Sequence, residues 1–384
     1  MIDRMQLGEV PPKPHTVFRS ADGRLRHEEC FTRLGFDGEF SILYHEEPPA
    51  ADREIGPAEP GRWDRQVPRA TEPQPLKRRL VLGAIAPEGW TPVAANADVV
   101  VSLFDLPPEA STGAGFANGD GDDLLYLFSG RGTLETPFGD LDVAGGDYVL
   151  VPRSVVHRFR IEERLSGIGF ELRGGVHLPT QYRNPAGQLR MDAPYTHRDF
   201  RRPVFRGPRP GPDEILVKKG DRFVRRVPAS SAFDVVGWDG AVWPFAFPIL
   251  SFQPKTGLVH LPPTIHATFA ARGGLVCSFV PRVTDFHPQA IPCPYPHSSV
   301  DCDELIYYVR GNFTSRRGVG PRAVSLHPAG IPHGPHPGAY EASIGTTSTD
   351  ELAVMLDTFL PLPLTAQALD LELAGYHDSW APRP

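Results

Sequence analysis

The chain has 384 residues, of which 40% are apolar and 22% charged, and this is the composition of a globular protein long enough for two domains. Its formal net charge of −7 argues against nucleic acid as a partner. No apolar run approaches the roughly 20 residues of a membrane-spanning helix, and the N-terminus carries no signal-peptide pattern. We therefore expect a cytoplasmic protein without membrane association.

The backbone pattern predicts a fold built from short strands. The sequence holds 43 prolines and 38 glycines, and helical periodicity is nearly absent from it. Short apolar runs with turn signals about every 8 to 12 residues are typical of sandwiches and jelly rolls. We therefore predict an all-β protein. Near the N-terminus Phe40–Tyr44 is a strand-like run, and we assign no chemistry to roughly the first hundred residues.

Two short motifs follow between residues 118 and 157. Asp123 and Gly130 enclose six residues, and Pro152 and His157 enclose four. The next region, residues 176–230, is rich in Arg, Pro and Gly and predicts an extended connection that packs over the preceding strands. Its basic run, Lys218–Arg226, is most simply a solvated face or a hairpin.

The C-terminal part carries the strongest functional signal. His297 and Glu304 enclose six residues, six more lead to Gly311, and Pro328-Ala-Gly-Ile-Pro-His333 follows. Glu304 opens the apolar run Leu305–Val309, and the Pro-x-Gly turn before His333 would return the chain antiparallel to it. Two imidazoles and one carboxylate could then converge on one ion. That ligand set, with open positions left, is typical of non-haem Fe(II) sites.

The paired motifs are similar to the two signature motifs of the cupin superfamily, and the segment 118–157 is a degenerate copy of them. The resemblance implies a bicupin, with two jelly-roll barrels and the metal site in the C-terminal barrel. Residues 1–240 would hold a metal-free barrel, with its core at about 95–175, and the extended connection, whereas residues 241–384 would form the catalytic barrel. Ser299 replaces the second histidine of the usual motif, so three protein ligands are implied.

In the metal-free copy Asn118 replaces the first histidine and Asp123 the glutamate, and we expect His157 to be structural. In the C-terminal copy one extra residue separates His297 from Glu304, which leaves Asp303 as an alternative ligand. Cys302 could in principle bind metal as well.

More narrowly, the chain is similar to the homogentisate 1,2-dioxygenases, and specifically to short, divergent bacterial members. The matching segments are Gly121–Tyr126, Glu135–Gly139, Phe170–Pro179, Phe233–Gly240, His260–Ile265, Pro294–His297 and Ser325–Pro335. The resemblance implies that His297, Glu304 and His333 bind iron. It also implies His260 as the acid/base, His327 as a second active-site histidine and Tyr295 as a residue lining the substrate. Phe313 stands where the family has a tyrosine, so the substrate pocket lacks one hydroxyl. His266, His287 and His336 match nothing assigned.

The resemblance implies an extradiol-type Fe(II) dioxygenase that uses O₂ to open homogentisate to maleylacetoacetate in tyrosine degradation. A homo-oligomer, trimer or hexamer, is also implied. Two alternatives stay open. The same chemistry could act on another ring, such as gentisate, a substituted hydroquinone or an aminophenol. A metal-bound cupin without dioxygenase activity, such as an isomerase, a sensor or a structural protein, is the second alternative.

Overall fold

The computed structural model describes residues 2–80, 88–111, 113–220, 222–313, 316 and 318–381. Within these ranges antiparallel strands dominate, and the single α-helix is α1, Ala339–Ser343. The predicted all-β class is therefore confirmed. Short 3₁₀ turns join some of the strands: η1 Pro108–Ala110, η2 Thr180–Tyr182, η3 His197–Asp199, η4 Ile249–Ser251, η5 Pro263–His266, η6 Ala366–Leu371 and η7 Tyr376–Trp380.

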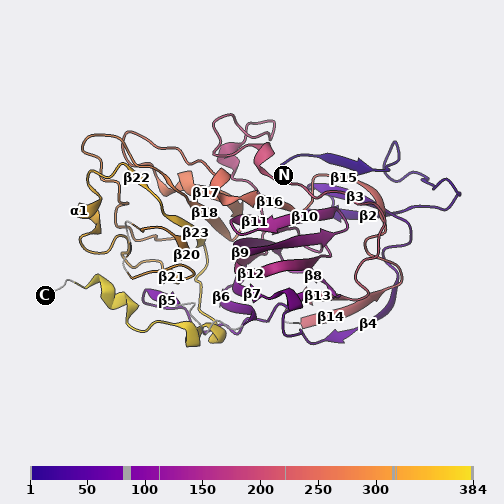
Figure 1. The fold of residues 1–384 in the computed structure, drawn as a ribbon, viewed down its shortest axis with the longest axis horizontal. Coiled ribbons are helices and arrows are strands. Elements are labelled where there is room, and N and C mark those ends of the chain that lie inside the picture. The colour runs from indigo at the N-terminus through magenta and orange to yellow at the C-terminus, as the bar shows by residue number, and fades with distance from the viewer. Residues whose placement is uncertain are drawn as a thin grey trace.

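Two large sheets lie side by side in the molecule (Figure 1). The first sheet runs, in spatial order, through β16 (Phe245–Pro248), β11 (Asp147–Val151), β9 (Asp122–Thr136), β12 (Arg158–Leu172), β7 (Val99–Leu106) and β6 (Gly89–Ala95), with β10 (Gly139–Ala144) paired to β9. The second sheet runs through β17 (Ala267–Ala271), β18 (Gly274–Phe279), β23 (Leu352–Thr358), β20 (Asp303–Arg310), β21 (Val324–His327) and β5 (Arg78–Leu80).

Smaller sheets flank the large ones. One holds β1 (Met5–Gly8), β15 (Val235–Gly240), β3 (Phe40–His45) and β2 (His27–Thr32). Another holds β4 (Asp52–Ala58), β14 (Arg222–Pro228), β13 (Ile215–Lys219) and β8 (Gly115–Asn118), and a pair joins β19 (Arg282–Val283) to β22 (Ser348–Thr349). The strand-like run at residues 40–44 is thus β3, and the basic run forms the β13–β14 hairpin.

The two large sheets repeat one local arrangement, as an internal duplication predicts. Asp123 lies at the start of β9, and an isolated backbone bridge joins Phe116 to His157. Glu304 lies at the start of β20, and a corresponding bridge joins His297 to His333. This repeat supports the bicupin fold.

Each of the two predicted domains contributes one strand to the large sheet of the other. β16, which follows residue 240, pairs with β11 of the first sheet. β5, from the N-terminal part, pairs with β21 of the second sheet. The division into domains 1–240 and 241–384 stays a prediction. No helix in the described part of the chain is long and apolar enough to cross a membrane.

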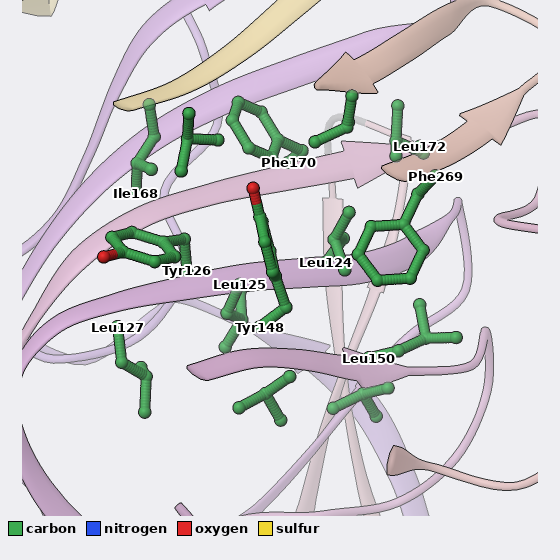
Figure 2. Packing of buried hydrophobic residues seen from close by; sticks show 14 of the residues in the cluster. Leu124, Leu125, Tyr126, Leu127, Tyr148, Leu150, Ile168, Phe170, Leu172 and Phe269 are labelled. Carbon is green, nitrogen blue, oxygen red and sulfur yellow. The ribbon is translucent and has the colours of Figure 1, made fainter. Parts of the chain in front are cut away.

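One hydrophobic core cluster includes residues of both large sheets. Figure 2 shows the ring of Tyr148 between those of Tyr126 and Phe269, with ring centroids 5.3 Å apart in each pair. The hydroxyl of Tyr148 lies 2.8 Å from that of Ser278 in β18, which in turn lies 2.6 Å from Thr268. Buried hydroxyls thus join the sheets through hydrogen bonds inside an apolar core.

Tyr148→Phe should lower the free energy of unfolding by about 1 kcal/mol, because it removes one buried hydrogen bond and keeps the ring packing. Urea unfolding at equilibrium, followed by fluorescence, measures this loss. Tyr126→Phe is the matched control, since Tyr126 belongs to the same cluster. A wild-type unfolding midpoint for Tyr148→Phe would contradict the assignment.

We call the part of the structure that carries Asp123 and His157 the first unit, and the part that carries Glu304 and His333 the second unit. The first unit contains a buried cation. Lys218, in β13, is 2% exposed, so the prediction of a solvated face is wrong for this residue, whereas the hairpin is confirmed. Its ammonium donates to Asp120 at 2.8 Å and to Glu171 at 3.0 Å. Removing a charge of this kind from water is costly unless it is paired, and here two carboxylates pair it.

Two of the residues that correspond to metal ligands in this unit, Asn118 and Asp123, belong to the same network. Asn118 donates to Asp123 and to Glu171, both at 3.0 Å. The guanidinium of Arg65 lies 3.3 Å from Asp123, although burial still raises the pKa of that carboxyl to about 6. His157 is buried, and desolvation lowers its pKa to about 4. Side-chain cations therefore stand next to the acids, which gives a physical basis for the prediction that this unit holds no metal.

Candidate metal centre

His297, Glu304 and His333 converge on one point. One ligand atom from each lies within 4.8 Å of the others. The Nε2 atoms of His297 and His333 are 3.8 Å and 3.9 Å from the nearest carboxylate oxygen of Glu304. The structure thus brings together the three residues that the motif spacing singled out.

The local fold places these residues. Glu304 is the second residue of β20, whose register with β21 sets it opposite His327. His297 and His333 exchange both backbone hydrogen bonds at 2.8 Å, which holds their two loops together. Gly311, which ends the apolar run after β20, has φ of +97°, and a Cβ there would lie 2.5 Å from the Asp350 carbonyl oxygen. The sharp turn at the end of the run therefore requires glycine.

Backbone carbonyls fix the tautomers of both histidines. His297 Nδ1 lies 3.2 Å from the Tyr295 carbonyl and His333 Nδ1 lies 2.8 Å from the Ile331 carbonyl. A carbonyl can only accept, so each Nδ1–H donates and each Nε2 keeps a free lone pair. The Nε2 of His333 is buried without a hydrogen-bond partner among the described residues. Two such imidazoles with a carboxylate fit a divalent transition metal.

Glu304 is held as a carboxylate. Burial alone would raise its pKa, but the hydrogen bond from His327 and the positive charge of Arg316 outweigh burial and keep the pKa of Glu304 well below its usual range. His327 is fully buried and neutral, since desolvation lowers its pKa to about 4, and its Nδ1–H donates to Glu304 at 2.7 Å. Arg316 adds a guanidinium 3.7 Å from the same oxygen. His327 therefore orients the proposed ligand Glu304.

The C-terminal turn η7 packs behind this centre. The ring of Trp380 stacks on His336 with centroids 3.9 Å apart and meets the edge of His327 at 6.0 Å. Its indole N–H donates to the carbonyl of Gly334 at 3.3 Å, next to His333. His327 and the loop that carries His333 are thus supported by an aromatic residue almost 50 positions later in the chain.

A cavity of about 330 Å³ opens in front of the centre. This volume lies at the lower end of the range for small-molecule sites, roughly 300–1,000 Å³. His260, His297, Glu304 and Phe313 are among its lining residues, and apolar side chains such as Phe279 and Met355 cover much of the rest. Tyr295, His327 and His333 are outside this lining set.

His260 lies between an acid and an aromatic ring. Its Nδ1 is 3.5 Å from Asp285 and its ring meets the edge of Tyr295, with centroids 5.0 Å apart. Nε2 has no hydrogen-bond partner within the described residues. Asp285 can therefore orient the imidazole and leave Nε2 for a ligand, whereas Tyr295 is 47% exposed and lies at the rim.

Phe313 contacts the cavity but brings no polar atom to it. Its ring meets the edge of Tyr308, with centroids 4.7 Å apart, and both residues line the cavity. The hydroxyl of Tyr308 lies 2.8 Å from that of Ser325, and the two form a hydrogen bond with each other. The hydroxyl that Phe313 lacks is thus not supplied by its neighbour.

Asp303 and Cys302, the two alternative metal ligands, are not arranged to bind a metal. Asp303 accepts hydrogen bonds from the backbone amides of Ala329 and Leu362, both at 2.7 Å, so both of its oxygens are in use. Burial raises the pKa of the Cys302 thiol to about 11, which disfavours the thiolate that a metal needs. Neither belongs to the cluster of candidate ligands in the described chain.

Three cavity residues were missed by sequence reasoning. Asp285 and Asp357 carried no spacing signal, and His266 was set aside as unassigned. Asp357 pairs in register with Glu304, and burial raises its pKa to about 7. Asp357 lies beside Glu304 because β20 pairs with β23, a pairing that local sequence patterns do not predict.

Comparisons with known proteins agree with the motif analysis. Residues 85–249 match the family model for the N-terminal part of homogentisate 1,2-dioxygenase. The chain is 35% identical over 390 residues to "Putative dioxygenase SSO1533" of Saccharolobus solfataricus, and the match covers 99% of both chains. It is 29% identical over 284 residues to the homogentisate 1,2-dioxygenase of Bradyrhizobium diazoefficiens, covering 69% of this chain and 62% of that enzyme.

Among solved structures, a cupin 2 conserved barrel domain protein from Leptotrichia buccalis is similar at 10% identity and a TM-score of 0.36. The similarity covers 73% of this chain and 92% of that one.

Proposed function

The chain belongs to the homogentisate dioxygenase-like family, and on that premise we propose that it is an Fe(II)-dependent dioxygenase that opens a hydroquinone-type ring with O₂. Homogentisate, opened to maleylacetoacetate, is the first substrate to test. One observation carries the proposal: His297, Glu304 and His333 converge on one point, and the first two line a cavity that His260 also lines.

The donor set supports iron. Two neutral imidazoles and one carboxylate leave coordination positions open for a substrate and for O₂. The bound metal would supply the redox chemistry that joins dioxygen to an electron-rich ring. His297, Glu304 and His333 would hold it, and His327 and Arg316 keep Glu304 charged and in place.

His260 is the proposed acid/base. Its unpartnered Nε2 can accept the proton that a phenolic hydroxyl loses on binding. Asp285, 3.5 Å from Nδ1, stabilises the imidazolium that results and fixes the direction of the ring. The apolar cavity wall around them favours an aromatic ring and limits water near the reacting group.

Oxygen uptake tests the proposal. Protein purified without oxygen and loaded with Fe(II) is offered homogentisate, gentisate, and a small panel of hydroquinones and aminophenols. If one molecule of O₂ is consumed for each molecule of an aromatic compound that disappears, the proposed function is supported, and that compound is the substrate. Iron-loaded protein that consumes no oxygen with any ring would instead favour a cupin with other chemistry.

A different ring is the second candidate, and Phe313 is the observation that favours it. We expect Phe313→Tyr to raise kcat/KM for homogentisate several-fold, because the new hydroxyl adds a hydrogen-bond donor to the cavity wall. Steady-state oxygen uptake with homogentisate measures the change. If the substitution lowers kcat/KM for homogentisate, the native ring is one that packs against the phenylalanine.

A further inference from the structure

His266 is a buried polar residue in the cavity wall that the proposed chemistry does not use. It ends the turn η5, is 6% exposed and belongs to the cavity lining. Its ring packs on Phe279 with centroids 4.8 Å apart, and its Nδ1 has no hydrogen-bond partner among the described residues. Buried polar atoms are normally paired, so an unpaired one in a cavity wall points to a ligand.

His266 lies away from the metal centre. It directly precedes β17, which is separated from β20 by β18 and β23. Three strand spacings of roughly 4.8 Å each therefore lie between it and Glu304 along the curved sheet. A ring held at the centre would reach His266 with a side group, not with its metal-bound edge.

The surrounding charges are already paired. The three cations that line the described cavity each contact an acid: Lys255 with Asp192 at 2.8 Å, Arg282 with Glu351 at 2.9 Å, and Arg316 with Glu304 at 3.7 Å. Burial and the nearby Arg282 lower the pKa of His266 to about 3, so the imidazole is neutral at physiological pH. A carboxylate on the substrate would meet no unpaired positive charge on this wall.

We infer that His266 is a specificity-determining residue that binds an uncharged hydrogen-bonding side group of the aromatic substrate, such as an amide or a hydroxyl. This inference rests on the proposed function and narrows its substrate class from aromatic acids to neutral hydroquinone derivatives. A neutral imidazole and a neutral side group satisfy each other, whereas a buried carboxylate without a cation is costly.

Anaerobic binding to the Fe(II)-loaded protein, followed by calorimetry, tests the inference with three rings: 2,5-dihydroxyphenylacetamide, homogentisate and unsubstituted hydroquinone. We expect the amide to bind at least roughly ten-fold more tightly than the acid. This comparison needs no variant, so it stands even if substitutions at the buried position unfold the protein.

Variants then assign the preference to one residue. His266→Leu should weaken binding of the amide roughly three- to ten-fold and leave hydroquinone unchanged, and His266→Gln, which keeps a hydrogen-bonding group, should restore most of the loss. His287→Leu is the matched control, because His287 lies outside the cavity lining. Metal content and Tm are measured for each variant.

The outcomes separate the two proposals. If none of the three rings binds, the proposed function is overturned and this inference falls with it. If the rings bind but homogentisate binds as tightly as the amide, or His266→Leu changes nothing, the inference alone is overturned.

Discussion

Glu304→Ala should abolish bound metal and ring cleavage together. Glu304 supplies the only carboxylate of the described triad and lies between the two free imidazole nitrogens, so its loss leaves two neutral ligands and no charge to offset a divalent cation. We expect metal content to fall from about one ion per chain to less than roughly a tenth, with turnover reduced at least about 10³-fold.

Metal analysis after gel filtration and oxygen uptake measure the two effects in parallel. Glu341→Gln is the matched control, since Glu341 is an exposed acid in α1 and should keep both metal and activity. His333→Ala should behave like Glu304→Ala. Full iron occupancy in either variant would contradict the ligand assignment.

His260→Gln should keep the metal and lose most turnover. The imidazole contacts none of the three ligands within the described contacts but lines the same cavity, so its removal affects proton transfer and leaves the triad intact. A general base contributes typically about 10²–10⁴-fold, and we expect kcat to fall by that factor. Asp285→Asn should give a smaller loss, because it alters only the orientation of the ring.

Metal analysis and the separate values of kcat and KM distinguish this role from a structural one. In His260→Gln kcat should fall while metal content stays at the wild-type level, and a His287→Gln control should keep both. A variant that loses its iron, or one that keeps wild-type kcat, would show that His260 does not act as the base.

The sequence predicted the triad because its spacing combines a strand start with two turn residues. Glu304 opens an apolar run, and Gly311 and the Pro-x-Gly turn before His333 fix where the chain reverses. Such local signals lie within about 40 residues of each other, so strand pairing follows from them with few alternatives. The all-β class followed likewise from local turn and strand patterns.

Local sequence patterns could not predict the residues that reach the site through contacts between segments distant in the sequence. Asp357 meets Glu304 only because β23 pairs with β20, about 50 residues earlier in the chain. Asp285 meets His260 because backbone hydrogen bonds join the loop at 286–287 to the loop at 257–258. Lys218 reads as one of several basic residues in a hairpin, and nothing local reveals that Asp120 and Glu171 surround it. Burial of a single residue in a polar run is decided by the packing of the sheet it joins.

In the first unit the positive charges next to the acids are the protein's own side chains, the ammonium of Lys218 and the guanidinium of Arg65. The acids there are neutralised as soon as the chain folds, whereas the proposed metal ligands of the second unit would need an ion from outside. We therefore expect iron starvation or a chelator to yield a folded, inactive protein that regains activity when iron returns, instead of one that unfolds. Under the proposed function, folding of the scaffold and supply of the metal would then be separate events, and folded apo-protein would persist until iron is available.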